Sequence, residues 1–170
     1  PYEKLILEMG ADKPGDIGYL VKRIQPNIGV FTNVKPMHLA EGQFSDLDDI
    51  FVEKSRLIKA ILESGWAVLN ADDTRVISLA KEVSCNVVTF GTATNSDLRA
   101  KNIRSTKEGL KFTLHYETTS HEVHFPYLLG RYQIYVLLPA FAVGFVMGVP
   151  FKKLYAALRD FRLPPGRMNR

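Results

Sequence analysis

The sequence predicts an α/β domain: a mostly parallel sheet flanked by helices, with a small antiparallel sheet appended to it. Two observations predict this class. Short apolar runs alternate with stretches in which apolar residues recur at helical spacing, as expected for parallel strands joined by right-handed crossovers. The apolar runs are 5–8, 28–32, 66–69 and 86–90. After Gly91 the pattern instead alternates apolar with polar residues, which is typical of antiparallel strands with one exposed face.

Punctuating residues divide the first half of the chain into its elements. Pro14-Gly15-Asp16 precedes a helix whose apolar face covers 17–24. Asp46 is the predicted N-cap of a longer amphipathic helix that Gly65 stops. A third helix is predicted over about 73–83, before the last of the apolar runs.

The second half predicts antiparallel strands followed by helices. The helices cover roughly 131–147 and 151–161, and Leu163-Pro164-Pro165-Gly166 ends them. Residues 134–150 carry no charge, but they are fewer than the roughly 20 residues that a membrane span needs, and they include Pro139. We therefore expect a buried helix against the sheet and no membrane span. The predicted strands are 98–103, 110–116 and 122–125.

Composition and charge exclude several classes of protein. A chain of 170 residues, of which 46% are hydrophobic, is long enough for one domain with a sizeable core. The net charge of +4 comes from 22 basic and 18 acidic residues scattered along the chain, and it predicts no nucleic-acid partner. The single cysteine, Cys85, excludes an intramolecular disulfide and suits a reducing compartment. With no signal peptide, we expect a cytoplasmic protein. We also expect it to be monomeric.

Three dispersed residues predict a metal site at one edge of the sheet. Glu8 and His38 both follow apolar runs, and open α/β sheets bind ligands outside the carboxyl ends of their parallel strands. A carboxylate and an imidazole there suit a divalent cation such as Mg²⁺, which usually accompanies phosphates. Lys54 lies on the apolar face of its predicted helix, where an unpaired lysine is costly to bury. Solvated side chains at Glu8 and His38, and a Lys54 stem that snorkels to water, are the simpler alternatives.

Several short sequence motifs follow one another along the chain in a characteristic order. They are Leu7-Glu8-Met9-Gly10-Ala11, Thr32-Asn33 with His38-Leu39, Glu53-Lys54, Leu69-Asn70-Ala71-Asp72-Asp73, Asn95-Ser96-Asp97-Leu98, Leu129-Gly130-Arg131 and Pro165-Gly166-Arg167. Together they resemble the central, ATP-binding domain of the Mur ligases, and the resemblance covers nearly the whole chain. It implies that residues 1–163 are part of this P-loop-type domain and that 164–170 begin a linker into a C-terminal domain that is absent here.

The resemblance implies roles for residues in these motifs. In the family, the residues matching Glu8 and His38 bind Mg²⁺, and the lysine matching Lys54 is carbamylated by CO₂. Desolvation favours the neutral amine that carbamylation needs, and the product is a carboxylate that can bind the metal. Lys54 and His38 are therefore the expected catalytic residues. The residues expected to contact ATP are Asn70, Asp72, Arg131, Gln133 and Arg167. A simpler alternative to the ATP-binding role is that Asp72 or Asp73 caps the helix that follows.

Some positions depart from the family's pattern. After the glycine and arginine that match Gly130-Arg131, Mur ligases continue with histidine and asparagine, and with another asparagine three residues on. Tyr132, Gln133 and Val136 occupy those positions here. Asn169 stands where an acidic residue is common. These changes leave open whether this chain binds adenine as the family does.

The activity that the resemblance implies is ATP-dependent amide-bond formation in peptidoglycan precursor synthesis. A carboxylate of a UDP-linked muramoyl tripeptide would be phosphorylated, and the amine of D-alanyl-D-alanine would attack the acyl phosphate, with Mg²⁺ offsetting charge. Asn95-Ser96-Asp97 and the small antiparallel sheet favour this D-alanyl-D-alanine-adding type. The alternatives are another Mur ligase, a folylpolyglutamate synthase-type ligase, and a degenerate, non-catalytic scaffold.

The family's phosphate-binding loop has no counterpart among these sequence motifs. That glycine-rich loop ends in glycine-lysine-threonine or serine, and it cradles phosphate with backbone N–H groups and one lysine. Gly91-Thr92-Ala93-Thr94 follows a predicted strand but lacks the lysine. We therefore expect an N-terminally truncated domain that is inactive on its own.

Overall fold

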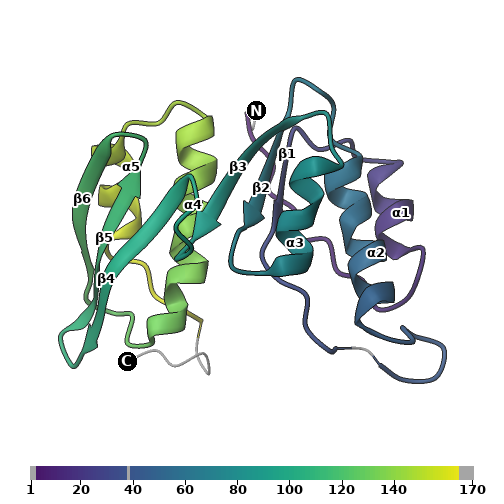
Figure 1. Cartoon of the computed structure of the whole chain (residues 1–170), viewed down its shortest axis with the longest axis horizontal. Helices are drawn as coiled ribbons and strands as arrows, with labels where there is room; N and C mark the ends of the chain where they lie inside the picture. The colour runs from purple at the N-terminus through teal and green to yellow at the C-terminus, as the bar shows by residue number, and fades with distance from the viewer. Residues whose placement is uncertain (1–2, 38, 165–170) are drawn as a thin grey trace.

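The computed structural model describes residues 3–37 and 39–164, which form a six-stranded sheet between two groups of helices (Figure 1). The strands are β1 Ile28–Phe31, β2 Trp66–Asn70, β3 Asn86–Gly91, β4 Leu98–Thr106, β5 Gly109–Tyr116 and β6 Thr119–Phe125. They lie in chain order across the sheet. β1 to β4 run parallel, whereas β5 pairs antiparallel with both β4 and β6. The predicted fold class is confirmed.

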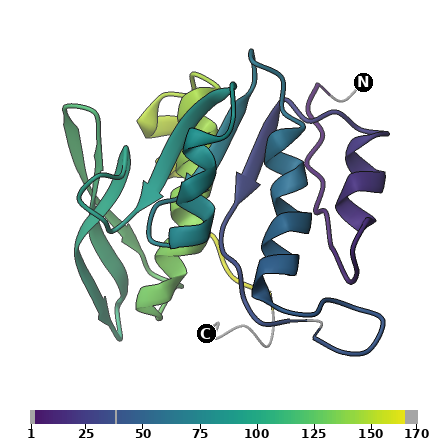
Figure 2. The same cartoon turned by 45° about the vertical axis from the view of Figure 1, so that its right-hand side comes forward.

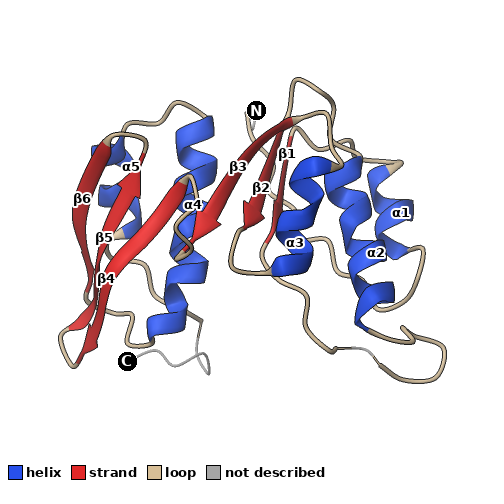
Figure 3. Cartoon of the chain, in the orientation of Figure 1, coloured by secondary structure: helices blue, strands red, loops and turns tan. Residues whose placement is uncertain are grey.

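Helices cover both faces of this sheet (Figure 3). They are α1 Asp16–Val21, α2 Leu47–Lys59, α3 Thr74–Ser78, α4 Ile134–Val146 and α5 Phe151–Leu158, with 3₁₀ turns η1 Leu79–Lys81 and η2 Arg131–Gln133. α2 and α3 pack on one face, with α1 against α2. α4 packs on the other face, and α5 lies against α4.

Side chains that alternate along the central strands supply two apolar cores. In β2, Val68 faces the core under α4, while Ala67 and Leu69 face the core under α2 and α3. All three are fully buried, so both faces of the strand are covered. The core under α4 is the more aromatic, with Phe90 and Phe141 fully buried in it.

The antiparallel strands continue the parallel sheet rather than forming a second one. β3 and β4 pair in parallel through Phe90 with Leu98 and Gly91 with Arg99. Parallel neighbours usually need a long crossover. Here β4 begins level with the end of β3, so a short loop over 92–97 is enough to join them. The small antiparallel sheet that the sequence predicted as an addition to the parallel sheet is therefore its direct continuation.

The apolar run at 5–8 is not a strand, and that prediction was wrong. Leu5, Ile6 and Leu7 are 76%, 94% and 45% exposed and have no strand assignment. A buried parallel strand needs a paired neighbour, and among the described residues β1 pairs with β2 alone. The segment instead runs past α2 to reach α1 (Figure 2), and Met9 packs against the cluster between these helices.

The uncharged segment near the C-terminal end forms α4, a buried helix as predicted. Leu137, Leu138 and Phe141 are buried against the sheet. The helix continues through Pro139, which is itself buried. Within the part of the chain that is described, no helix is both long and apolar enough to cross a membrane.

Candidate functional site

The carboxyl ends of β1 and β2 lie side by side at the edge where the sequence predicts the site. Asn70 ends β2 and is buried. Its Nδ2 donates to the carbonyl oxygen of Thr32 at 2.7 Å, and its Oδ1 accepts from the N–H of Asp72 at 2.9 Å. Asn70 therefore ties the end of β1 to the turn after β2.

The two aspartates after β2 have different partners. Asp73 is the N-cap of α3, and its Oδ1 accepts from the N–H groups of Arg75 and Val76 at 3.0 and 3.1 Å. Its Oδ2 accepts from the N–H of Val34, beyond β1, at 3.0 Å. Capping, the simpler alternative for this pair, is thus carried out by Asp73, and the carboxylate of Asp72 points elsewhere.

Asp72 joins three segments at this edge. Its Oδ2 accepts from the N–H and hydroxyl of Thr92, at 2.7 and 3.0 Å, and from the hydroxyl of Tyr135 at 2.7 Å. Its Oδ1 accepts from the N–H of Ala93 at 2.8 Å. Gly91 permits this close approach, because a Cβ there would lie 2.8 Å from the carboxylate. The loop after β3 and the first turn of α4 are therefore both held to the end of β2.

This network shifts the pKa values of both partners. Burial acts to raise the pKa of Asp72, but the donors from Tyr135, Thr92 and Ala93 outweigh it and hold that pKa below its ordinary value. Burial, together with the neighbouring carboxylate of Asp72, raises the pKa of Tyr135 to about 12. The pair is therefore a neutral tyrosine donating to a charged carboxylate at neutral pH.

The turn before α4 contains two of the predicted nucleotide contacts. Arg131 is exposed, and its Nη1 donates to the carbonyl oxygen of Ile103 at 3.3 Å. Gln133 is fully buried, and its Oε1 accepts from the N–H of Gly130 at 2.7 Å. Gln133 therefore closes the turn that begins the helix, while the exposed Tyr132 occupies the place of the family's histidine.

An apolar cluster brings together the segments that carry the predicted metal ligands. Ile50 of α2 is buried in it, with Met9 and Val34 packed around it. Met9 directly follows Glu8, and Val34 lies shortly before His38. Segments that are far apart in the sequence thus meet at the N-terminal half of α2.

Lys54 lies in the middle of the buried face of α2, four residues from both Ile50 and Ile58, which are buried. Its own side chain is only half-buried, and no described residue forms a hydrogen bond or ion pair with it. Glu8 is exposed and also has no partner in the described ranges. His38 lies outside the described residues.

Glu53, the neighbour of Lys54, is a residue whose importance the sequence did not reveal. It is 2% exposed, and its Oε1 accepts from the N–H groups of Ile17 and Gly18 at 2.8 and 3.1 Å. Its Oε2 lies 3.0 Å from Nε of Arg56. Burial acts to raise its pKa, but the N–H donors at the start of α1 and the guanidinium lower it below its ordinary value. The sequence showed only an acidic residue beside the apolar face of a helix, within the Glu53-Lys54 motif, and did not indicate its partners.

The arrangement leaves groups free for a ligand. No cluster of three histidine, cysteine or carboxylate side chains that could hold a metal ion occurs among the residues described. A metal at this edge would therefore need His38 or a Lys54 converted into a carbamate. Glu8 and Lys54 fit that requirement, because neither has a hydrogen-bond or ion-pair partner among the described residues. The exposed guanidinium of Arg131 is available to an anion, and Arg167 lies outside the described residues.

Comparison with known proteins defines the class. The family described as "Mur ligase middle domain" matches residues 1–144. The chain therefore belongs to the Mur ligase family, as its motifs predicted.

Individual relatives indicate which types of Mur ligase the chain is similar to. UDP-N-acetylmuramoyl-tripeptide–D-alanyl-D-alanine ligase of Escherichia coli (strain K12) is 32% identical over 169 residues, covering 98% of this chain and 37% of that protein. The ligase of the same name from Mycobacterium tuberculosis (strain H37Rv) is 35% identical over 155 residues, covering 91% and 30%. UDP-N-acetylmuramoyl-L-alanyl-D-glutamate–2,6-diaminopimelate ligase of Thermosynechococcus vestitus is 33% identical over 146 residues, covering 85% and 29%. The chain spans about a third of the length of these curated relatives.

Solved structures agree with this similarity. MurF from Acinetobacter baumannii superimposes with a TM-score of 0.83 at 26% identity, over 93% of this chain and 34% of that one. MurF from Thermotoga maritima, determined in complex with ADP, gives a TM-score of 0.77 at 26% identity, over 94% and 36%.

Proposed function

We propose that this chain is the nucleotide- and metal-binding part of an ATP-dependent ligase that joins D-alanyl-D-alanine to a UDP-muramoyl tripeptide. The observation that carries the proposal is similarity over 98% of the chain to a ligase of that name. The edge formed by the ends of β1 and β2, where Asn70 and Asp72 lie, supports it, since open α/β sheets bind their ligands there. Because the chain spans about a third of such relatives, the activity is proposed for the whole protein.

The reaction needs an activated carboxylate. ATP would supply the phosphoryl group for an acyl phosphate, and a bound Mg²⁺ would offset its charge. Glu8, His38 and the carbamate of Lys54 would hold the metal. The neutral amine of Lys54 would add CO₂ and release a proton, which forms the carbamate. The resulting carboxylate would replace a cation that has no ion-pair partner among the described residues.

The nucleotide contacts follow from what each side chain leaves available. Arg131, and Arg167 beyond the described residues, would face the phosphates of ATP. Asn70 and Asp72 would shape the edge through their backbone and side-chain partners. Gln133 would act by fixing the first turn of α4, because its amide already closes that turn.

The proposal also covers the cellular compartment and the oligomeric state of the protein. We propose a cytoplasmic, monomeric enzyme, which the single free and buried Cys85 suits. Size-exclusion chromatography with light scattering tests the oligomeric state, and a dimer would contradict it.

The test of function is ADP release by the whole protein that carries this chain. We expect release only when UDP-muramoyl tripeptide and D-alanyl-D-alanine are both present with ATP and Mg²⁺. The relative that adds 2,6-diaminopimelate makes a panel of amine substrates necessary. Release with another amine alone would reassign the ligase type, and no release with any amine would favour the non-catalytic scaffold.

A second experiment tests Lys54. Lys54→Ala should lower kcat by about a hundredfold or more, since it removes a group that acts on the charge of the transferring phosphoryl group. Lys59→Ala is the matched control, because Lys59 lies on the same helix but is exposed and pairs with Glu82 at 2.7 Å. Acetate should partly restore the Lys54→Ala variant and leave the control unchanged. Normal turnover of Lys54→Ala without added carboxylate would contradict the role.

A further inference from the structure

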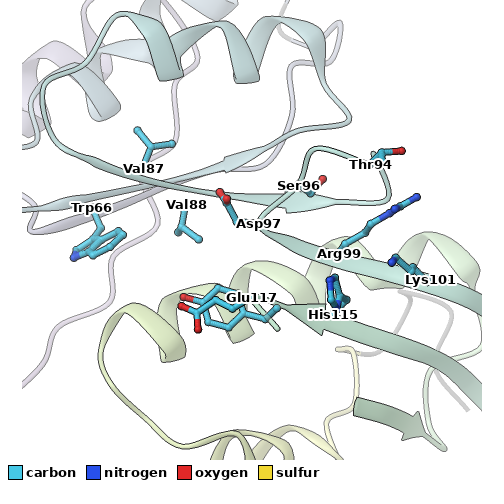
Figure 4. A pocket seen from close by; sticks show the side chains of 11 residues that line it. Trp66, Val87, Val88, Thr94, Ser96, Asp97, Arg99, Lys101, His115 and Glu117 are labelled. Carbon is cyan, nitrogen blue, oxygen red and sulfur yellow. The ribbon is translucent and has the colours of Figure 1, made fainter. Parts of the chain in front are cut away.

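A cleft opens where the parallel and antiparallel parts of the sheet diverge. β3 pairs with β4 only through Phe90 and Gly91, so the first half of β3 separates from the β4–β5 hairpin. The space between them measures about 560 Å³. Figure 4 shows Arg99, Lys101 and His115 at one end, below the loop that carries Ser96. That loop also contacts Asp72 on the nucleotide edge, so the cleft adjoins the proposed site without belonging to it.

Ser96 in the wall of this cleft has an unsatisfied hydroxyl. The residue is 9% exposed. Among residues 3–37 and 39–164, the Oγ of Ser96 is the one buried side-chain polar atom without a hydrogen-bond partner. Buried polar atoms are nearly always paired, and an exception calls for an explanation, such as a missing ligand. A serine hydroxyl can turn between staggered rotamers to meet a group that enters the cleft.

The cationic end of the cleft is formed by the exposed face of the hairpin. Arg99 and Lys101 are two residues apart in β4, so they share one face, and His115 of β5 pairs directly with Arg99. All three side chains are half-buried. No carboxylate in the described part of the chain forms an ion pair with Arg99 or Lys101; the Nε of Arg99 donates to the carbonyl oxygen of Thr92 at 2.9 Å. The Nδ1 of His115 lies 2.9 Å from both the carbonyl oxygen of Thr119 and the Oγ of Ser120 in the β5–β6 turn.

The acidic side chains of the cleft are engaged elsewhere. Oδ2 of Asp97 accepts from the N–H and hydroxyl of Thr89, at 2.8 and 2.7 Å. Glu117 lies beside Tyr116, toward the other end of the cleft from Lys101 (Figure 4). Burial, and then the charges of Glu117 and Asp97, raise the pKa of Tyr116. Glu122, which lies on the same face two strands from Lys101, accepts from the hydroxyl of Thr113 at 2.6 Å. Among the described residues, no carboxylate therefore forms an ion pair at the cationic end.

We propose that this cleft binds a small oxyanion, a phosphate or a carboxylate, through the hydroxyl of Ser96 and the cationic groups of Arg99 and Lys101, beside the imidazole of His115. The anion carries the negative charge that the half-buried cations lack, and it accepts the hydrogen bond that Ser96 does not make within the chain. Nothing in this inference depends on the proposed ligase activity.

The experiment is a titration of the isotope-labelled protein with inorganic phosphate and, separately, with acetate at constant ionic strength, followed by amide chemical shifts. We expect saturable shifts at residues 94–101 and 115. A tighter phosphate constant identifies a phosphoryl ligand and a tighter acetate constant identifies a carboxylate ligand, and both support the site. No saturable shift with either anion would overturn it.

Two variants separate a built site from general charge attraction. Lys101→Gln should weaken binding by about tenfold, because a hydrogen bond to a charged group is lost. Lys111→Gln removes the same charge from the far end of the hairpin, where Lys111 pairs with Glu108 at 3.3 Å, and should leave binding unchanged. Equal weakening by both variants would mean that the anion responds to net charge only, and the proposal would fail.

Ser96→Ala provides the independent check. It should weaken anion binding severalfold while leaving the thermal midpoint unchanged or higher, since no internal hydrogen bond is lost. A lower midpoint would show that the hydroxyl serves the fold, and unaltered binding would show that it does not meet the anion. Either result would overturn the assignment of Ser96 to an anion site.

Discussion

The hydroxyl of Tyr135 donates a 2.7 Å hydrogen bond to the carboxylate of Asp72, although 63 positions separate the two residues. Asp72 follows β2 and precedes α3 on one face of the sheet, and Tyr135 lies in the first turn of α4 on the other. The bond therefore crosses the end of the sheet. It fixes the helix that follows Arg131 relative to the loop after β3, and so it shapes the edge at which we propose that nucleotide binds.

Tyr135→Phe should lower the free energy of unfolding by about 1 kcal/mol, because it removes one hydrogen bond to a charged group at a half-buried position. Urea denaturation at neutral pH measures the change. Tyr19→Phe, at an exposed tyrosine whose ring lies against Arg23, is the control and should have little effect.

The same bond predicts a loss of stability at high pH. The pKa of Tyr135 is raised from 10.0 to about 12, so its contribution is complete below pH 10 and disappears as the pH rises through about 12. In the Tyr135→Phe variant, the free energy of unfolding should not show this part of its decrease at high pH. Parallel curves for the two proteins between pH 10 and 12 would contradict the assignment.

Gly91→Ala should disrupt the network without changing any of its polar groups. The added Cβ would meet the carboxylate of Asp72 at 2.8 Å, so the aspartate must move away from Thr92 or from Tyr135. We expect a lower thermal midpoint and a pKa for Tyr135 closer to 10, read from tyrosinate absorbance. An unchanged titration with a lower midpoint would mean that the strand, rather than the network, absorbs the clash.

Glu53→Gln should destabilise the chain by about 1.5–3 kcal/mol at neutral pH, because a buried charged acceptor loses its strength toward Ile17, Gly18 and Arg56. The pKa of Glu53 lies below its ordinary 4.5, so its contribution is present above pH 4.5 and is lost as the pH falls through the lower, folded-state value. Chemical denaturation at neutral and acid pH measures both effects. Glu63→Gln, at an exposed glutamate, should not change the loss of stability at acid pH.

The sequence predicts the elements well where one local pattern decides them. β1, β2 and β3 begin where the apolar runs begin, and Asp46 caps α2 with its Oδ1 accepting from two backbone N–H groups. The run at 5–8 shows the limit of this reasoning, because apolar composition does not reveal whether a partner strand is present to pair with it.

The site is harder to predict, because its contacts join distant parts of the chain. Asp72 and Asp73 look alike in the sequence, and the fold alone determines which caps α3 and which meets Tyr135. Gln133 matches a family amide, yet its neighbourhood turns it inward to the N–H of Gly130. A resemblance can locate such residues at an edge, but their partners depend on packing.

Lys54→Met should separate stability from activity. Methionine keeps most of the length of the side chain and removes an amine that has no partner in the described part of the chain, amid buried residues such as Ile50 and Ile58. We therefore expect the free energy of unfolding to stay equal or rise. Ile58→Ala, by contrast, should lower it by about 2–5 kcal/mol through the cavity that it creates.

Ligase turnover of the whole protein should respond in the opposite sense, because methionine cannot form a carbamate. Lys54→Met should lose activity while remaining folded. Denaturation curves and steady-state rates on the same preparations measure both properties. A loss of stability as large as that of Ile58→Ala would show that the lysine serves the fold, whereas retained turnover would show that the proposed metal site does not need its carbamate.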